Sequence, residues 1–237
     1  MRVGKGSPGN ALTLAYMPLG VLLAILLAGL YSFAFHLGFT PPLISLGLLV
    51  ILVVGIGLAT RQLKASAAAG TRLTLAHMGL VCLLGGIAAA PPAEFSPLML
   101  WSLTAIAAAA VGILVVEAWI TEKVDAAGPF SRRLGWEANG LLVLSLAVLL
   151  WRTGKADGWV VAAGAVHYVS LVLSLVLPSL RRESSANWRP YLPIAMAVAL
   201  ILALAPTVPS IIATGLGAVV LVLALAAAAT DISAARS

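Results

Sequence analysis

The sequence predicts an all-α integral membrane protein: a polytopic bundle of eight transmembrane helices with both termini in the cytoplasm. Two observations lead to this prediction. Of the 237 residues, 62% are hydrophobic and only 9% are charged. Apolar runs of about 20 residues, each long enough to cross a hydrocarbon core, recur along the whole chain. No stretch has the polar surface of a soluble domain, so residues 1–237 are expected to form one transmembrane domain.

The eight predicted spans follow one another with short connections. They cover residues 13–36, 41–60, 73–90, 96–120, 134–151, 158–180, 190–206 and 209–230. The first span follows a basic start that imitates a signal peptide, but its apolar run exceeds the roughly 7–15 residues of a cleavable core. We therefore expect it to be retained as the first transmembrane helix. Proline-rich turns such as TPP at 40–42 and APTVP at 205–209 are expected on the outer side.

Orientation follows from Lys and Arg, which favour the cytoplasmic loops of membrane proteins. One side of the predicted topology receives 12 of the 14 Lys and Arg residues, and the other receives only Arg152 and Lys155. We therefore expect a multi-pass protein of the plasma (inner) membrane. The net charge of +6 is explained by contact with anionic lipid headgroups. The bilayer is the expected partner, nucleic acid is not, and a homo-oligomer or a larger membrane complex is left open.

Three ionisable side chains lie near the cytoplasmic ends of three successive predicted spans. By the helical rise, His77 lies about 6–8 Å inside its span, and Glu117 and Glu137 lie about 5 Å inside theirs. Such groups usually mark a path for ions, protons or substrate, and together they suit a divalent metal or a proton-exchange site. The structural alternative is that both carboxylates reach water at the interface and Glu137 pairs with Arg133.

A polar stripe runs along the sixth span, where Gly164, His167, Ser170 and Ser174 repeat at spacings of three and four residues. His167 is expected roughly 20 Å from the cytoplasmic end. The stripe either lines a hydrated path or supplies interhelical hydrogen bonds. An imidazole stranded in lipid is costly, so His167 should have a partner on the helix of Glu137 or on the small-residue face of the fourth span. The opposite side, expected to meet lipid or apolar core, carries Ala165, Val169, Val172 and Val176.

Other motifs add little. The single Cys82 allows no internal disulfide and no thiolate metal cluster, and the chain has no HExxH, Walker loop or GxSxG. Arg132 and Arg133 are expected at the inner interface, where they could hold a lipid phosphate or anchor the helix. The different heights of the three histidines disfavour a six-coordinate haem, whereas a haem on one axial His is left open.

Three classes of function follow. The first, which we favour, is a transporter or channel for a small solute, ion or proton, with the stripe of span six along the path and the inner carboxylate and His cluster at its mouth. The second is an intramembrane enzyme or redox subunit that binds a metal or haem through one His, either His167 or His77. The third is a structural or assembly subunit of a larger membrane complex. The sequence names neither a substrate nor a cofactor.

Overall fold

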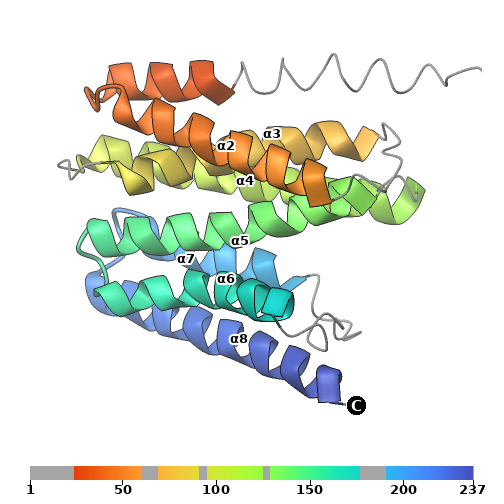
Figure 1. Cartoon of the computed structure of the whole chain (residues 1–237). Coiled ribbons are helices and arrows are strands. Elements are labelled where there is room, and N and C mark those ends of the chain that lie inside the picture. The colour runs from red at the N-terminus through yellow and green to blue at the C-terminus, as the bar shows by residue number, and fades with distance from the viewer. Residues whose placement is uncertain (1–23, 60–68, 91–94, 125–128, 177–190, 237) are drawn as a thin grey trace, which may run out of the picture.

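A computed structural model describes residues 24–59, 69–90, 95–124, 129–176 and 191–236, and every regular element in them is a helix. A first helical stretch, Ala24–Ala34, precedes α2. The other elements, in chain order, are α2 (Thr40–Ala59), α3 (Ala69–Ala89), α4 (Pro97–Val124), α5 (Pro129–Arg152), the 3-10 turn η1 (Gly158–Val160), α6 (Val161–Val176), α7 (Leu192–Leu204) and α8 (Ser210–Arg236). The predicted all-α class is confirmed (Figure 1).

Three helical stretches are long and apolar enough to cross a membrane: Pro97–Val116, Leu134–Arg152 and Ser210–Ser233. Shorter apolar stretches lie in the remaining helices. They are Ala24–Ala34, Thr40–Leu52, Leu73–Ala89, Gly158–Leu173 and Leu192–Leu204. In the part of the chain that the structure describes, three helices can therefore span a bilayer by length and composition.

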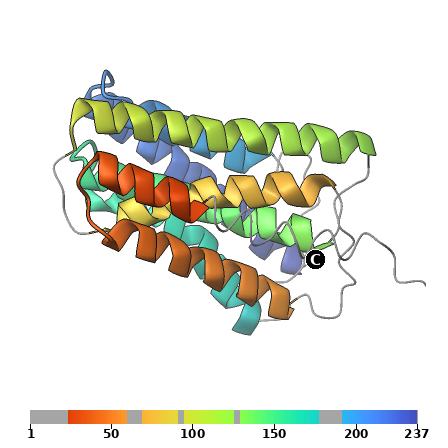
Figure 2. The same ribbon diagram turned by 90° about the horizontal axis from the view of Figure 1, so that it is seen from above.

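The helices run along a common direction (Figure 2), with α5 at the centre. This helix packs against α3 on one side and against α6 and α7 on the other, while α2 and α4 flank α3 and α8 covers α6 and α7. Of the apolar window in α5, 67% is buried inside the protein, compared with 33% in α4 and 22% in α8. Polar side chains on α5, such as Glu137 and Ser145, are therefore shielded by other helices, as are Thr74 and His77 on α3.

Glycine allows α5 and α6 to approach closely. A Cβ atom added to Gly164 would lie 2.3 Å from the Cα of Leu144, a distance at which the two backbones would have to separate. Small residues at such crossings let helices gain dispersion energy in a bilayer, where the hydrophobic effect does not drive them together. Gly164 thus has a packing role in the predicted polar stripe.

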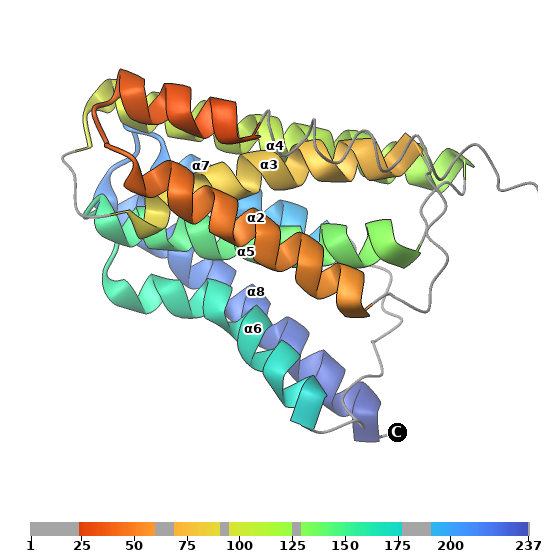
Figure 3. The same ribbon diagram turned by 45° about the horizontal axis from the view of Figure 1, so that its top comes forward.

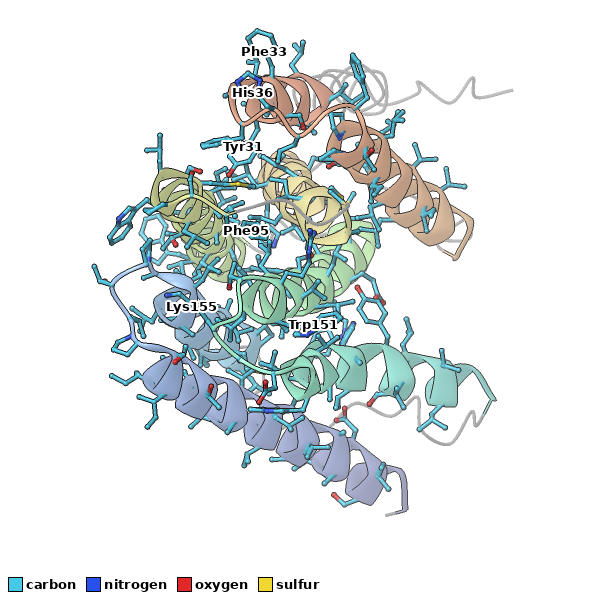
Figure 4. The ribbon with its side chains drawn as sticks, turned by 90° about the vertical axis from the view of Figure 1, so that its left-hand side faces the viewer. Tyr31, Phe33, His36, Phe95, Trp151 and Lys155 are labelled. Carbon is cyan, nitrogen blue, oxygen red and sulfur yellow. The ribbon has the colours of Figure 1, made fainter. Side chains whose placement is uncertain are left out.

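Two cations, Arg152 and Lys155, form hydrogen bonds at one end of the bundle. Figure 4 labels Lys155 at this end. Arg152 donates from Nη1 to the carbonyl oxygens of Ile87 and Ala88 at 3.0 and 2.8 Å, at the C-terminal end of α3. Lys155 lies in the turn after α5, and its Nζ donates to the carbonyl oxygens of Ala205 and of Val208, the latter at 3.1 Å. These contacts join the α5–α6 turn to the ends of α3 and α7.

At the opposite end, α6 and α8 run side by side and diverge from α5 towards their C-terminal ends (Figure 3). A cavity lies at this end between α5, α6, α7 and α8. The candidate site lies there.

Candidate functional site

The central feature of the site is a contact between an imidazole and a carboxylate. The Nε2 atom of His167 on α6 lies 3.4 Å from Oε2 of Glu137 on α5. The side chain of Glu137 is 7% exposed and that of His167 is 24% exposed. The expectation that His167 has a hydrogen-bond partner on the helix of Glu137 is therefore confirmed. With Glu137 as carboxylate, the Nε2–H group of the ring donates and the carboxylate accepts.

Gly140 makes this contact sterically accessible. A Cβ atom added there would lie 2.2 Å from Cδ2 and 2.5 Å from Nε2 of His167, so the imidazole lies directly against the backbone of α5. Glu137, Gly140 and Leu144 follow one another at spacings of three and four residues and so share a face of α5. That face meets Gly164 and His167 on α6. The rings of Trp136 and Tyr168 lie 6.2 and 5.1 Å from the imidazole centroid and complete its surroundings.

The predicted heights of the two residues were wrong. Counting along the predicted spans put His167 about 15 Å deeper than Glu137, whereas the side chains are in contact. One cause is that α5 begins at Pro129, before the predicted start at residue 134. Hydropathy marks the apolar part of a helix, and the helix continues through the charged residues beside it. Glu137 therefore lies about 12 Å from the start of its helix.

A cavity of about 100 Å³ lies next to this pair, between α5, α6, α7 and α8. Its volume corresponds to about three water molecules. The lining is largely apolar, with residues such as Val143, Val166 and Met196. The polar side chains and the indole at its wall come from α5, α6 and α8: Trp136, Asn139, His167, Ser170 and Asp231. An apolar cavity with a few polar groups is the usual form of a small-molecule site.

The stripe of the sixth span is divided between two roles. Gly164 packs on α5, while His167 and Ser170 line the cavity. The side chain of Ser174 lies outside the described residues. On the opposite side of α6, Val169 and Val172 are 57% and 58% exposed, as expected for a face that meets lipid. The exposure of Val169 and Val172 agrees with the orientation predicted for this helix, whereas Ala165 is half-buried and the side chain of Val176 lies outside the described residues.

The predicted inner cluster is not assembled by the residues that the structure describes. His77 is fully buried on α3, and its Nδ1 lies 2.9 Å from the carbonyl oxygen of Ala110 on α4. Glu137 meets His167, and the side chain of Glu117 lies outside the described part of α4. Among the described residues, no three His, Cys, Asp or Glu side chains come together as metal ligands. The three-residue site and its metal stay a prediction. The side chains of Arg132 and Arg133, the lipid-phosphate candidates, also lie outside the described set.

Three residues of the site were missed by the sequence reasoning. Asn139 and Gly140 follow Glu137 directly in the string WEANG, and the helical spacing from Glu137 to Gly140 was a usable signal. Asp231 was missed because the last span was drawn to residue 230, whereas α8 continues to Arg236. The omission of Asn139 and Gly140 has a different origin, because both lie inside the predicted span 134–151.

The fold and the site define a class: an all-α protein with helices able to cross a membrane and a small, largely apolar cavity that has a few polar groups at its wall. No protein-family model, curated protein or solved structure matches the chain. The argument for its function therefore depends on the geometry of the site.

Proposed function

We propose that this chain is a multi-pass protein of the plasma membrane, with eight spans and cytoplasmic termini, that transports a small solute, ion or proton through the cavity between α5 and α8. The observation that supports this proposal is the contact of His167 with Glu137 at the wall of that cavity. Ionisable groups inside membrane helices are costly and mark paths for ions, protons or substrates. A purely structural pair would not require an adjoining cavity with further polar walls.

The chemistry of the pair suits reversible proton binding. Histidine is the side chain whose charge ordinarily changes in the physiological pH range. A carboxylate within hydrogen-bond reach of the ring compensates the charge of an imidazolium, which an apolar bundle would otherwise disfavour. In the proposed cycle, the pair gains or releases a proton as a solute enters or leaves the cavity. A subunit that binds haem or a metal, and an assembly subunit of a larger complex, are the two alternative functions.

Reconstituted liposomes test this proposal. The protein is inserted into vesicles that contain a pH-sensitive dye, and proton entry is followed after a pH step, with and without small polar solutes outside. Replacing His167→Gln or Glu137→Gln should reduce the flux to the level of protein-free vesicles. His36→Asn is the matched control, because His36 is exposed and has a φ of 54°, a conformation that Asn tolerates.

Solutes that move without protons are followed in the same vesicles by swelling, measured as light scattering. If wild type and the His167→Gln variant give the same proton flux and the same swelling rates, the transport proposal is wrong. A dependence of either rate on His167, with the His36→Asn control unaffected, supports it.

The proposed topology has its own test. Thr207, exposed in the turn between α7 and α8, is placed outside, and Lys64 is placed in a cytoplasmic loop. Cysteine at Thr207 should therefore react with an impermeant maleimide in intact cells, and cysteine at Lys64 only after permeabilisation. Thr207 is a better reporter than Lys155, because Lys155 bonds to backbone carbonyls. The native Cys82 is buried and should stay silent. The reverse labelling pattern would remove the eight-span topology.

A further inference from the structure

His77 has a defined arrangement of hydrogens in its neutral form. Its Nδ1 lies 2.9 Å from the carbonyl oxygen of Ala110, and a carbonyl oxygen can only accept a hydrogen bond. The Nδ1 atom therefore carries the hydrogen. In a neutral imidazole the other nitrogen, Nε2, is then a bare acceptor. This nitrogen is buried and has no hydrogen-bond partner among the described residues.

Asn139 connects this nitrogen to the cavity. Its side chain lies beside His77 across the contact of α3 with α5, and the same residue lines the cavity. The Oδ1 atom of Asn139 is also buried without a hydrogen-bond partner in the described part of the chain. Two neighbouring acceptors thus lack a donor, a state that buried polar groups in folded proteins rarely keep. Either of two changes supplies the donor: rotation of the amide, or a proton on Nε2.

We propose that His77 is a proton-binding site and that Asn139 transmits its protonation state to the cavity wall. With His77 neutral, the amide N–H of Asn139 donates to Nε2 and Oδ1 is turned towards the cavity. With His77 protonated, Nε2–H donates to Oδ1 and the amide NH2 is turned towards the cavity. The proton enters and leaves at Nε2, and the amide rotates by about half a turn without any other bond changing.

Among the described residues around His77, Asn139 is the one to which we assign the exchange of the hydrogen bond at Nε2. In their described parts, α2 and α4 contribute no ionisable side chain against α3. On the first helical stretch, the hydroxyl of Tyr31 pairs with Ser102. On α5 the described ionisable side chains are Glu137, which meets His167, and Arg152, which bonds to Ile87 and Ala88 at the C-terminal end of α3. On α3 itself, Cys82 is a buried thiol. A buried imidazolium is tolerated when both of its N–H groups have hydrogen-bond acceptors. For His77 these acceptors are the carbonyl oxygen of Ala110 and Oδ1 of Asn139.

The consequence concerns the solute. The cavity wall presents an acceptor while His77 is neutral and a donor while it is protonated, so a hydrogen-bonding solute would bind the two states with different affinity. That difference is what couples one binding event to another. The effect on a transported solute rests on the proposed transport function, whereas the protonation of His77 and the rotation of the Asn139 amide do not. It predicts a solute with a hydrogen-bond donor, released when His77 takes up a proton.

Nitrogen NMR of the full-length protein in micelles, labelled with 15N in the histidine rings, tests the proposal. The His77 signals are assigned by their loss in His77→Gln. At high pH the hydrogen should be on Nδ1, and the ring should titrate in a single step. Asn139→Asp should raise the proton affinity of His77 about tenfold or more, because an opposite charge lies next to Nε2. Asn139→Leu should lower the affinity. Ser170→Ala, at the same cavity, is the control and should leave it unchanged.

The proposal is overturned if the neutral ring carries its hydrogen on Nε2, or if Asp and Leu at position 139 shift the titration in the same direction. It is also overturned if His77 fails to titrate in both the wild type and Asn139→Asp. The tautomer is read in the wild type, so a variant that does not fold leaves this test intact. If His77 titrates as expected and Asn139→Asp raises its proton affinity in a protein that shows no flux, the transport function is wrong but the proton site is supported.

Discussion

The two ends of the bundle use scarce charged groups in different ways. At the Arg152–Lys155 end, each cation donates to carbonyl oxygens at or just beyond the C-terminal end of another helix. At the cavity end, α6 and α8 diverge from α5, His167 and Asp231 line a space of about 100 Å³, and Glu137 contacts His167. Cations at helix C-termini satisfy unpaired carbonyls and the helix dipole. The charged groups at the first end are therefore hydrogen-bonded to the ends of other helices, whereas those at the second end lie beside a cavity.

This difference also gives Arg152 and Lys155 a local role. They are the two cations that the predicted topology assigned to the outer side, against the general bias of Lys and Arg. The ring of Phe95 lies 5.5 Å from Cζ of Arg152, which adds a cation–π contact to its two hydrogen bonds. Both residues are bonded to the fold, so neither acts as a free loop charge.

The largest effect is expected where the two ends are joined, at the crossing of α5 with α6. Gly164→Ala places a Cβ atom against the Leu144 backbone, and overpacking of this kind costs about 3 kcal/mol. The free energy of unfolding in mixed detergent micelles measures the loss. Gly215→Ala is the control, since an added Cβ there meets nothing within 4 Å. Equal stability of the two variants would contradict the close crossing.

A smaller loss is expected at the Arg152–Lys155 end. Lys155→Met keeps most of the length of the side chain but removes the donor to the carbonyl oxygens of Ala205 and Val208. Hydrogen bonds to a charged group contribute about 2 kcal/mol, so stability should fall by that amount. Hydrogen exchange should quicken in the turn between α7 and α8 and stay unchanged around the cavity. Asp157→Asn, an exposed change in the same turn as Lys155, serves as the control. Faster hydrogen exchange around the cavity would show that the hydrogen bonds of Lys155 also stabilise the cavity end.

The smallest effect is expected at the cavity end. Gly140→Ala displaces the imidazole of His167 and should cost about 1 kcal/mol, because a side chain moves more easily than a backbone. In a His167→Asn background the ring is gone, and the same Gly140→Ala change should cost nothing. A double-mutant cycle measures this coupling. Gly164→Ala in the same background should keep its full cost. If Gly140→Ala is equally harmful with and without His167, the imidazole does not lie on Gly140.

Much of the fold was predictable from the order of apolar and polar residues along the chain. Within the described residues, the apolar runs predicted helices at the correct places, because the length and hydropathy of a segment are properties of consecutive residues. The buried face of α6 was predictable for the same reason, since residues three and four apart share a helix face wherever the helix is placed. A partner for His167 was expected on the helix of Glu137 or on the fourth span, because a buried polar group requires one, and it lies on the helix of Glu137.

Only the tertiary structure shows which residues meet. The contact of His167 with Gly140 depends on how closely α5 and α6 cross, and that distance is determined by Gly164 against Leu144, residues 20 positions apart in the chain. The position of Asn139 between His77 and the cavity depends on the rotation of α5 between α3 and α6. The bonds of Arg152 and Lys155 reach carbonyls 48 to 65 residues away in the chain. Hydropathy carries no information on the register or crossing of two helices, because these follow from side-chain packing along their whole contact.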